Sequence, residues 1–107
     1  MTNEIYKEWS GMTAQQYKEF KSIRKENLRD NMSDIEIALT DIGEITARDI
    51  ARNEKPTGLK ENKKVAKRGG TVAKKTKDFY EEVTGLKAIT EKNNLDYEYI
   101  DNKRISN

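Results

Sequence analysis

The sequence contains no cysteine and no histidine. The lack of cysteine excludes a disulfide framework and a thiolate zinc site, and the lack of histidine removes the commonest general base and metal ligand. No apolar run approaches the roughly 20 residues that a membrane-spanning helix needs, and the N-terminal residues contain no apolar signal-peptide core. We therefore expect a soluble, cytoplasmic protein that is not an enzyme and that binds no metal, no cofactor and no membrane.

Large apolar side chains are also scarce. Leu, Ile, Val and Phe number 20 among the 107 residues, which is close to the range in which chains stop folding. The 21 basic side chains nearly balance the 19 acidic ones, whereas disordered chains usually carry a large net charge. The sequence thus predicts one folded domain with a thin core. A thin core favours self-association, and the commonest form of self-association is a homodimer.

The sequence pattern of the N-terminal region predicts one short helix. Thr13 followed by Gln16 fits the capping box that starts helices. Residues 24–32 are polar and rich in Asn and Asp, and this composition indicates a turn or a short helical link. Tyr6 and Trp9 precede the predicted helix and form either a patch for a partner or a cover over the thin core.

Two long helices follow, and they give the chain its expected all-α fold. Ser33 and Glu36 form a second capping box, and apolar residues recur behind it at helical spacing over residues 34–53. The only proline, Pro56, ends this helix. A third helix is predicted over residues 59–84, packed antiparallel to the second.

The C-terminal region is expected to lack long helices. Gly85 is in the usual place for a left-handed cap on the third helix, and residues 86–90 form a short strand or an extended arm. We assign residues 1–90 to a single helical domain and residues 91–107 to an extended polar tail. That tail contains three large side chains, those of Tyr97, Tyr99 and Ile100.

The third helix carries an apolar seam with alternating spacings of four and three residues, typical of a packed helix. The seam keeps its phase through Gly69-Gly70, so we predict an unbroken helix with a notch of small residues where another helix comes close. Gly43 in the second helix is either a second such contact or a tolerated defect. The seam either pairs two chains or is covered by residues 34–53. Its positions are Val65, Gly69, Val72, Thr76, Phe79 and Val83.

Charge is segregated between the two long helices. Residues 60–78 carry eight basic and two acidic side chains, whereas residues 30–49 carry six acidic and one basic side chain. The basic run has three interpretations: a phosphate-binding surface, a solvated helix face, or a surface that docks onto an acidic helix of the same chain or of a partner. The candidate binding residues are Lys63, Lys64, Lys67, Arg68, Lys74 and Lys75.

Four strings carry a family pattern: KENLRDNM (25–32), IEIALTDIGEITARDIARNEKP (35–56), ENKKVAKRGGTVAKK (61–75) and TGLK (84–87). With the lead-in at residues 11–21 they resemble the bacterial DNA-damage-inducible protein D family over about three quarters of the chain. Members of that family are usually longer, and their N-terminal part is similar to the Bro-N domain of phage antirepressors. No such domain precedes Gly11, so we expect a shortened, prophage-borne relative or a C-terminal fragment.

The resemblance implies a role in the bacterial DNA-damage response or in prophage regulation, and it supplies no catalytic motif. We therefore expect a non-enzymatic accessory factor that binds protein or nucleic acid through the basic helix. Its partner would be DNA, in which case the protein would be nucleoid-associated, or a DNA-repair or regulatory protein. The alternative is a structural oligomerisation module whose seam pairs two chains and whose charges keep it in solution.

Overall fold

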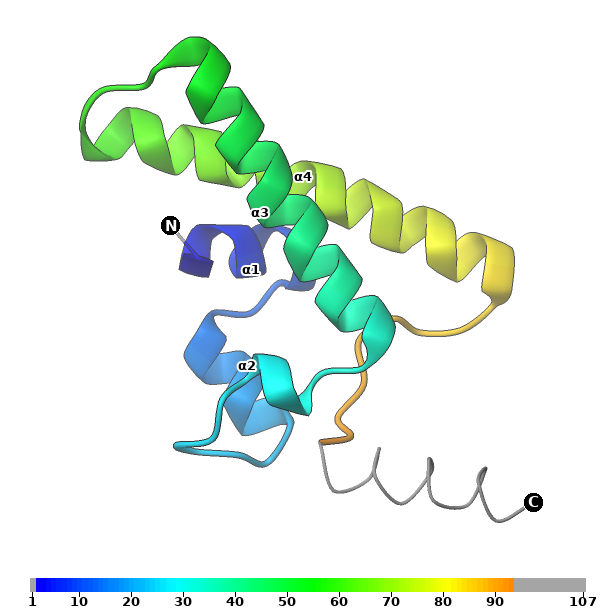
Figure 1. Cartoon of the computed structure of the whole chain (residues 1–107). Coiled ribbons are helices and arrows are strands. Elements are labelled where there is room, and N and C mark those ends of the chain that lie inside the picture. The colour runs from blue at the N-terminus through cyan, green and yellow to red at the C-terminus, as the bar shows by residue number, and fades with distance from the viewer. Residues whose placement is uncertain (1, 94–107) are drawn as a thin grey trace.

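The computed structural model describes residues 2–93, which form four α-helices and no strand (Figure 1). This confirms the all-α class and the two long helices, whose predicted bounds differ from the observed ones by one residue. The structure adds one helix that was not predicted, α1. Tyr97, Tyr99 and Ile100 lie outside the described residues. The elements are α1 (Thr2–Ser10), α2 (Ala14–Phe20), a 3₁₀ turn (Arg29–Asn31), α3 (Asp34–Glu54) and α4 (Gly58–Thr84).

Side chains close the starts of α2 and α3 as the sequence predicts. The Thr13 side chain accepts a hydrogen bond from the Gln16 backbone N–H, and the Gln16 side chain accepts one from the Thr13 backbone N–H. Ser33 and Glu36 make the same reciprocal pair at α3. Each pair satisfies backbone donors that a helix start leaves open. Both capping boxes are confirmed.

The C-terminal ends of the two long helices have left-handed caps. At α3 the cap is Lys55, with φ of +51°, and Pro56 follows it. At α4 the cap is Gly85, with φ of +71°, as predicted. Residues 86–90 form neither helix nor strand. Of the two interpretations, a short strand or an extended arm, the extended arm therefore remains.

The missed helix, α1, contributes much of the hydrophobic core. Tyr6 and Trp9 of α1 are buried together with Tyr17 of α2, and the centroids of the three rings lie 5.9–6.2 Å apart. These are edge-to-face or tilted contacts of the kind that aromatic rings prefer. Tyr6 and Trp9 therefore cover the thin core, and the interpretation as a partner patch is wrong.

The helices α3 and α4 run in opposite directions and cross near their middles (Figure 1). A Cβ atom added to Gly69 would lie 2.5 Å from the Gly43 carbonyl oxygen and 2.8 Å from the Ala47 Cβ. A Cβ added to Gly70 would instead meet α1, at 2.6 Å from the Glu8 Cβ. The two adjacent glycines thus let two different helices, α3 and α1, pack closely against α4. The unbroken helix and the small-residue notch are confirmed, and Gly43 is a site of close contact.

The predicted seam forms the packing side of α4 only in part. Val65 and Gly69 are buried and Thr76 is half-buried, but Val72, Phe79 and Val83 are exposed. The seam marks apolar residues that share a strip of the helix, whereas packing followed the small residues, where backbones can come close. The residues of α4 that are buried are Val65, Ala66, Gly69, Gly70 and Ala73.

Gly69→Ala should lower the free energy of unfolding. Alanine favours helices over glycine by about 1 kcal/mol, but the new Cβ would lie 2.5 Å from a backbone oxygen that cannot rotate away. We expect the overpacking cost, about 1–3 kcal/mol, to outweigh the gain, as measured by urea unfolding. Lys67→Ala, on the exposed side of the same helix, is the control and should stay within about 0.5 kcal/mol of the wild type. Equal stability of Gly69→Ala and the wild type would contradict the close approach.

Candidate nucleic-acid interface

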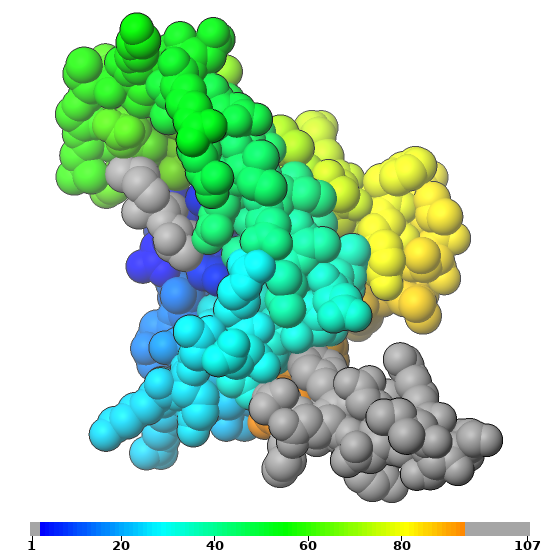
Figure 2. Space-filling model, viewed as in Figure 1, coloured from blue at the N-terminus to red at the C-terminus, as the bar shows by residue number. Residues whose placement is uncertain are grey.

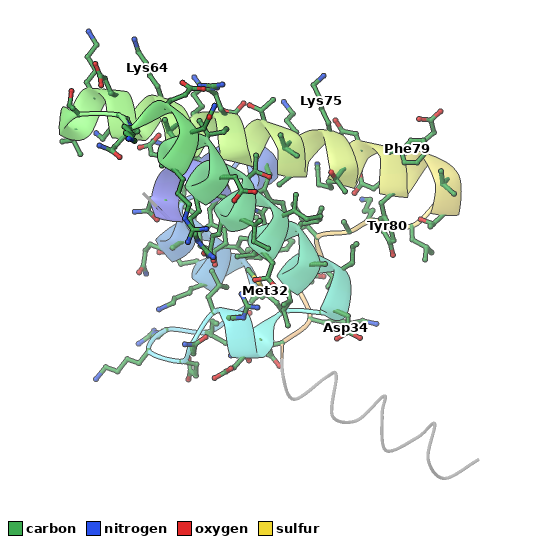
Figure 3. All side chains as sticks on the ribbon, turned by 45° about the horizontal axis from the view of Figure 1, so that its top comes forward. Met32, Asp34, Lys64, Lys75, Phe79 and Tyr80 are labelled. Carbon is green, nitrogen blue, oxygen red and sulfur yellow. The ribbon has the colours of Figure 1, made fainter. Side chains whose placement is uncertain are left out.

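The predicted basic residues gather on the side of α4 that faces away from the core. We call Lys63, Lys64, Lys67, Lys74 and Lys75 the basic face, and all five are exposed. At 100° per residue they fall within an arc of about 120° that begins roughly 60° from the buried Ala66. The labelled side chains of Lys64 and Lys75 point away from the body of the molecule (Figure 3). The structure thus brings the predicted lysines together on an accessible surface.

The sixth candidate, Arg68, lies beside this face and has an internal partner. Its Nη1 atom lies 2.9 Å from Oε1 of Glu54, near the turn that joins α3 to α4. The hydrogen bond from Arg68 lowers the pKa of the Glu54 carboxyl below its ordinary value. Within residues 2–93, no carboxylate oxygen lies within 4.0 Å of the ammonium groups of the basic face. Docking of the basic run onto the acidic helix of the same chain is therefore limited to Arg68.

Two acidic side chains of α3 pair with cations outside the basic face. Asp41 pairs with Arg29, with 2.8 Å between Oδ1 and Nη1, and the hydrogen bond from Arg29 lowers the pKa of the Asp41 carboxyl. Glu36 pairs with Lys21 at 2.9 Å. Since α3 does not turn these carboxylates toward the basic face, the segregated charge of the sequence remains segregated on the surface of the folded chain.

The basic face has the dimensions of a short phosphate-binding strip. From Lys63 to Lys75 it spans about 18 Å at the rise of an α-helix, a length over which duplex DNA carries roughly ten phosphates. It ends at Asp78, whose carboxylate lies 3.6 Å from the Lys77 ammonium. The five basic-face side chains are all lysines, which act as point charges on phosphate, and none is an aromatic ring on which a base could stack.

A cluster of buried polar side chains lies inside the protein, at the N-terminal end of α3. Lys21 and Glu36 are both fully buried. The Lys21 ammonium donates to Oε1 of Glu36 at 2.9 Å, and the hydroxyl of Tyr17 donates to Oε2 of the same carboxylate. Burying a charge is costly unless it is paired and hydrogen-bonded. This network meets that condition, which is why charged side chains can lie in so small a core.

The same lysine fastens the C-terminal arm to the domain. Its ammonium also donates to the carbonyl oxygens of Thr90 and Lys92, each at 2.7 Å, and the side-chain amide of Asn93 donates to the Lys21 carbonyl. Ala88 of the arm is buried. The chain therefore stays in contact with the domain as far as Asn93, beyond the predicted boundary at residue 90.

Sequence reasoning identified only part of this cluster. Glu36 was predicted as a capping residue, and it does accept a hydrogen bond from the Ser33 backbone N–H. Nothing in the pattern marked Lys21 as a buried residue, since lysine is almost never fully buried unless it is paired. The one available signal was its position one turn after Tyr17 on the side of α2 that faces the core.

Other kinds of site find little support in residues 2–93. No group of three or more Asp or Glu side chains in this range is placed to hold a metal ion. None of its helices is both long enough and apolar enough to cross a membrane. An open groove at the α3–α4 turn is lined by side chains of both charge signs, which gives it no preference for a charged ligand. Its lining residues are Glu54, Pro56, Glu61, Lys64, Val65 and Arg68.

Comparison with known proteins gives no match: no family model, no curated protein and no solved structure matches the chain. The resemblance to the DNA-damage-inducible protein D family therefore stays a prediction based on the strings quoted above.

Lys21→Met should strongly destabilise the fold. Methionine matches the lysine side chain as far as Cε but removes the ammonium, which leaves the Glu36 carboxylate buried without its cation. Breaking a buried pair in this way costs about 3–5 kcal/mol, measurable by urea unfolding. Limited proteolysis should also cut near residues 90–93, because two of their carbonyls lose a donor.

Two further variants show whether the loss of stability comes from the unpaired buried charge or from the change in side-chain volume. Adding Glu36→Gln to Lys21→Met removes the stranded charge and keeps the amide oxygen for the Ser33 N–H, so part of the stability should return. Arg29→Met breaks the exposed pair with Asp41 and should cost at most about 1 kcal/mol. Equal losses of stability for Lys21→Met and Arg29→Met would show that the buried pair stabilises the fold no more than the exposed pair does.

Proposed function

We propose that the chain is a non-enzymatic accessory factor that binds the phosphate backbone of nucleic acid through the basic face of α4. The observation that carries the proposal is the set of five exposed lysines that no carboxylate of the described residues neutralises. The setting, the DNA-damage response or prophage regulation, comes from the family resemblance alone. The cellular location that fits this role is the cytoplasm, in association with the nucleoid.

The chemistry of the basic face favours binding without sequence selection. Each lysine that neutralises a phosphate releases condensed counterions, and this release gives an affinity that falls steeply with salt. Phosphate contacts position a protein on a duplex but carry no sequence information. Five flexible ammonium groups on one strip of a helix supply contacts of this kind. The function would therefore be to hold nucleic acid near another activity rather than to recognise an operator.

The proposal is tested by measuring duplex-DNA binding by fluorescence anisotropy at several salt concentrations. The logarithm of the binding constant should fall with the logarithm of salt by roughly 0.9 per phosphate neutralised. The triple variant Lys63→Gln, Lys64→Gln, Lys67→Gln should bind all sequences more weakly and lower this slope by up to about 2.7, three times the value for one phosphate.

A matched control removes the same number of charges elsewhere. Lys7, Lys25 and Lys87 are exposed and lie off the basic face, so their triple replacement by Gln should leave the slope nearly unchanged. Equal effects of the two triple variants would show that only net charge matters. Unchanged binding in the Lys63, Lys64, Lys67 variant would assign the face to solvent or to an acidic protein partner, and either result would overturn the proposal.

The alternative function, a structural oligomerisation module, is favoured by a different observation. Val72, Phe79 and Val83 are large apolar side chains that the fold leaves exposed on α4. A module of this kind would show a melting temperature that rises with protein concentration and no affinity for nucleic acid. The salt series on DNA therefore distinguishes the two functions, because only the first predicts affinity for nucleic acid.

A further inference from the structure

The C-terminal half of α4 carries an uncovered strip of apolar side chains, which we call the apolar stripe. The exposed fractions of its residues are 42% for Val72, 66% for Phe79, 67% for Val83 and 60% for Leu86, which directly follows the helix. Phe79 points away from the body of the molecule, whereas its neighbour Tyr80 points toward it (Figure 3). The space-filling view shows this half of α4 projecting at one side of the body (Figure 2).

The four residues form one continuous strip rather than scattered exposed positions. At 100° per residue, Val72, Phe79 and Val83 fall within about 40° of one another, and the exposed Leu86 comes just after the Gly85 cap that ends the helix. A single exposed apolar residue needs no explanation, but a contiguous row is typical of an interaction surface. Within residues 2–93 nothing covers this row, because the arm after Gly85 runs back toward Lys21 instead.

Charges beside the stripe match those of a second copy of the same helix. Lys75 and Glu82 lie seven residues apart on the same flank of the stripe, and both are exposed. Within residues 2–93 neither forms an ion pair. When two identical helices pair antiparallel about a two-fold axis, each flank meets the same flank of its copy. Opposite charges on one flank then face each other twice.

The register of this pairing follows from the stripe itself. With Phe79 on the two-fold axis, residues equally far before and after it come level with each other across the interface. Lys75 then comes within one residue of Glu82 of the second copy, and Val72 comes level with the end of α4 of the second copy, which Leu86 follows. In a parallel pair this flank would meet the opposite flank, where Thr76 and Tyr80 offer no charge. The antiparallel arrangement therefore satisfies both the apolar and the charged residues.

We propose that the apolar stripe is a self-association surface, on which a second copy of this chain packs antiparallel with Phe79 at the two-fold axis. The contact spans about four helical turns on each chain, so the interface is small and the dimer dissociates on dilution. The pairing does not require nucleic acid, since Lys63, Lys64 and Lys67 come before Val72, where the apolar stripe begins.

Sedimentation equilibrium of the protein without nucleic acid, over about a hundredfold range of concentration, tests the proposal. The wild type should pass from monomer to dimer. Phe79→Glu places two carboxylates at the axis and should weaken dimerisation by at least about tenfold. Because Phe79 is 66% exposed, the helical circular dichroism and the melting temperature of the variant monomer should stay unchanged.

The matched control is Leu59→Glu. Leu59 lies on the same helix and is also 66% exposed, but it lies at the other end and off the stripe, so its replacement should leave the dimer intact. A wild type that stays monomeric over the whole range would overturn the proposal and leave the stripe to another protein. Equal effects of the two substitutions, or none from Phe79→Glu, would overturn it as well.

A charge exchange tests the antiparallel register separately. Lys75→Glu alone sets like charges against each other and should weaken the dimer, whereas the double variant Lys75→Glu, Glu82→Lys restores opposite charges and should recover it. Failure of the double variant to recover would overturn the register. The Lys63, Lys64, Lys67 triple variant should dimerise like the wild type, so a loss of DNA binding and a loss of pairing are told apart.

Discussion

The arrangement of the helices depends on a close approach of backbones at the point where α4 meets α3 and α1. Gly69 admits the carbonyl of Gly43, and Gly70 admits α1. Such a crossing brings helices together with little side-chain area, so it adds little to a core that is already short of large apolar residues. The aromatic cluster of Tyr6, Trp9 and Tyr17 supplies the missing volume. The crossing lies in the first half of α4, and it therefore leaves the second half free to project.

The buried pair of Lys21 and Glu36 stabilises the end of the fold that lies away from this crossing. It joins α2, the start of α3 and the arm at residues 90–92 through hydrogen bonds to a single ammonium. Charged groups in a core gain little net energy over apolar ones, but they leave few alternative arrangements once buried. The pair therefore directs the chain after α4 back toward α2, and this path keeps the arm off the apolar stripe.

Local chemistry made much of this fold predictable, because caps and breaks depend on neighbours in the sequence. The two capping boxes and Gly85 set the ends of helices to within one residue. The helix α1 escaped prediction because a nine-residue helix is marginal alone and is stabilised by packing onto α4. Apolar spacing grouped Val72 with Phe79 correctly but could not tell which side of α4 packs, since that depends on a backbone approach. The burial of Lys21 depends on Glu36, which is distant in the sequence.

The three sides of α4 connect the two proposed activities. The small residues lie on one side, the apolar stripe lies beside them, and the basic face lies beyond the stripe. A two-fold axis perpendicular to an antiparallel pair keeps each flank on its own side, so both basic faces would lie together, opposite both cores. With Phe79 on the axis their centres would be roughly 30 Å apart, comparable to one turn of duplex DNA. Pairing would thus join two weak phosphate-binding strips on one surface, and linked sites bind more tightly than either alone. A thin core and an uncovered stripe are then consistent with a chain that is built to function in pairs.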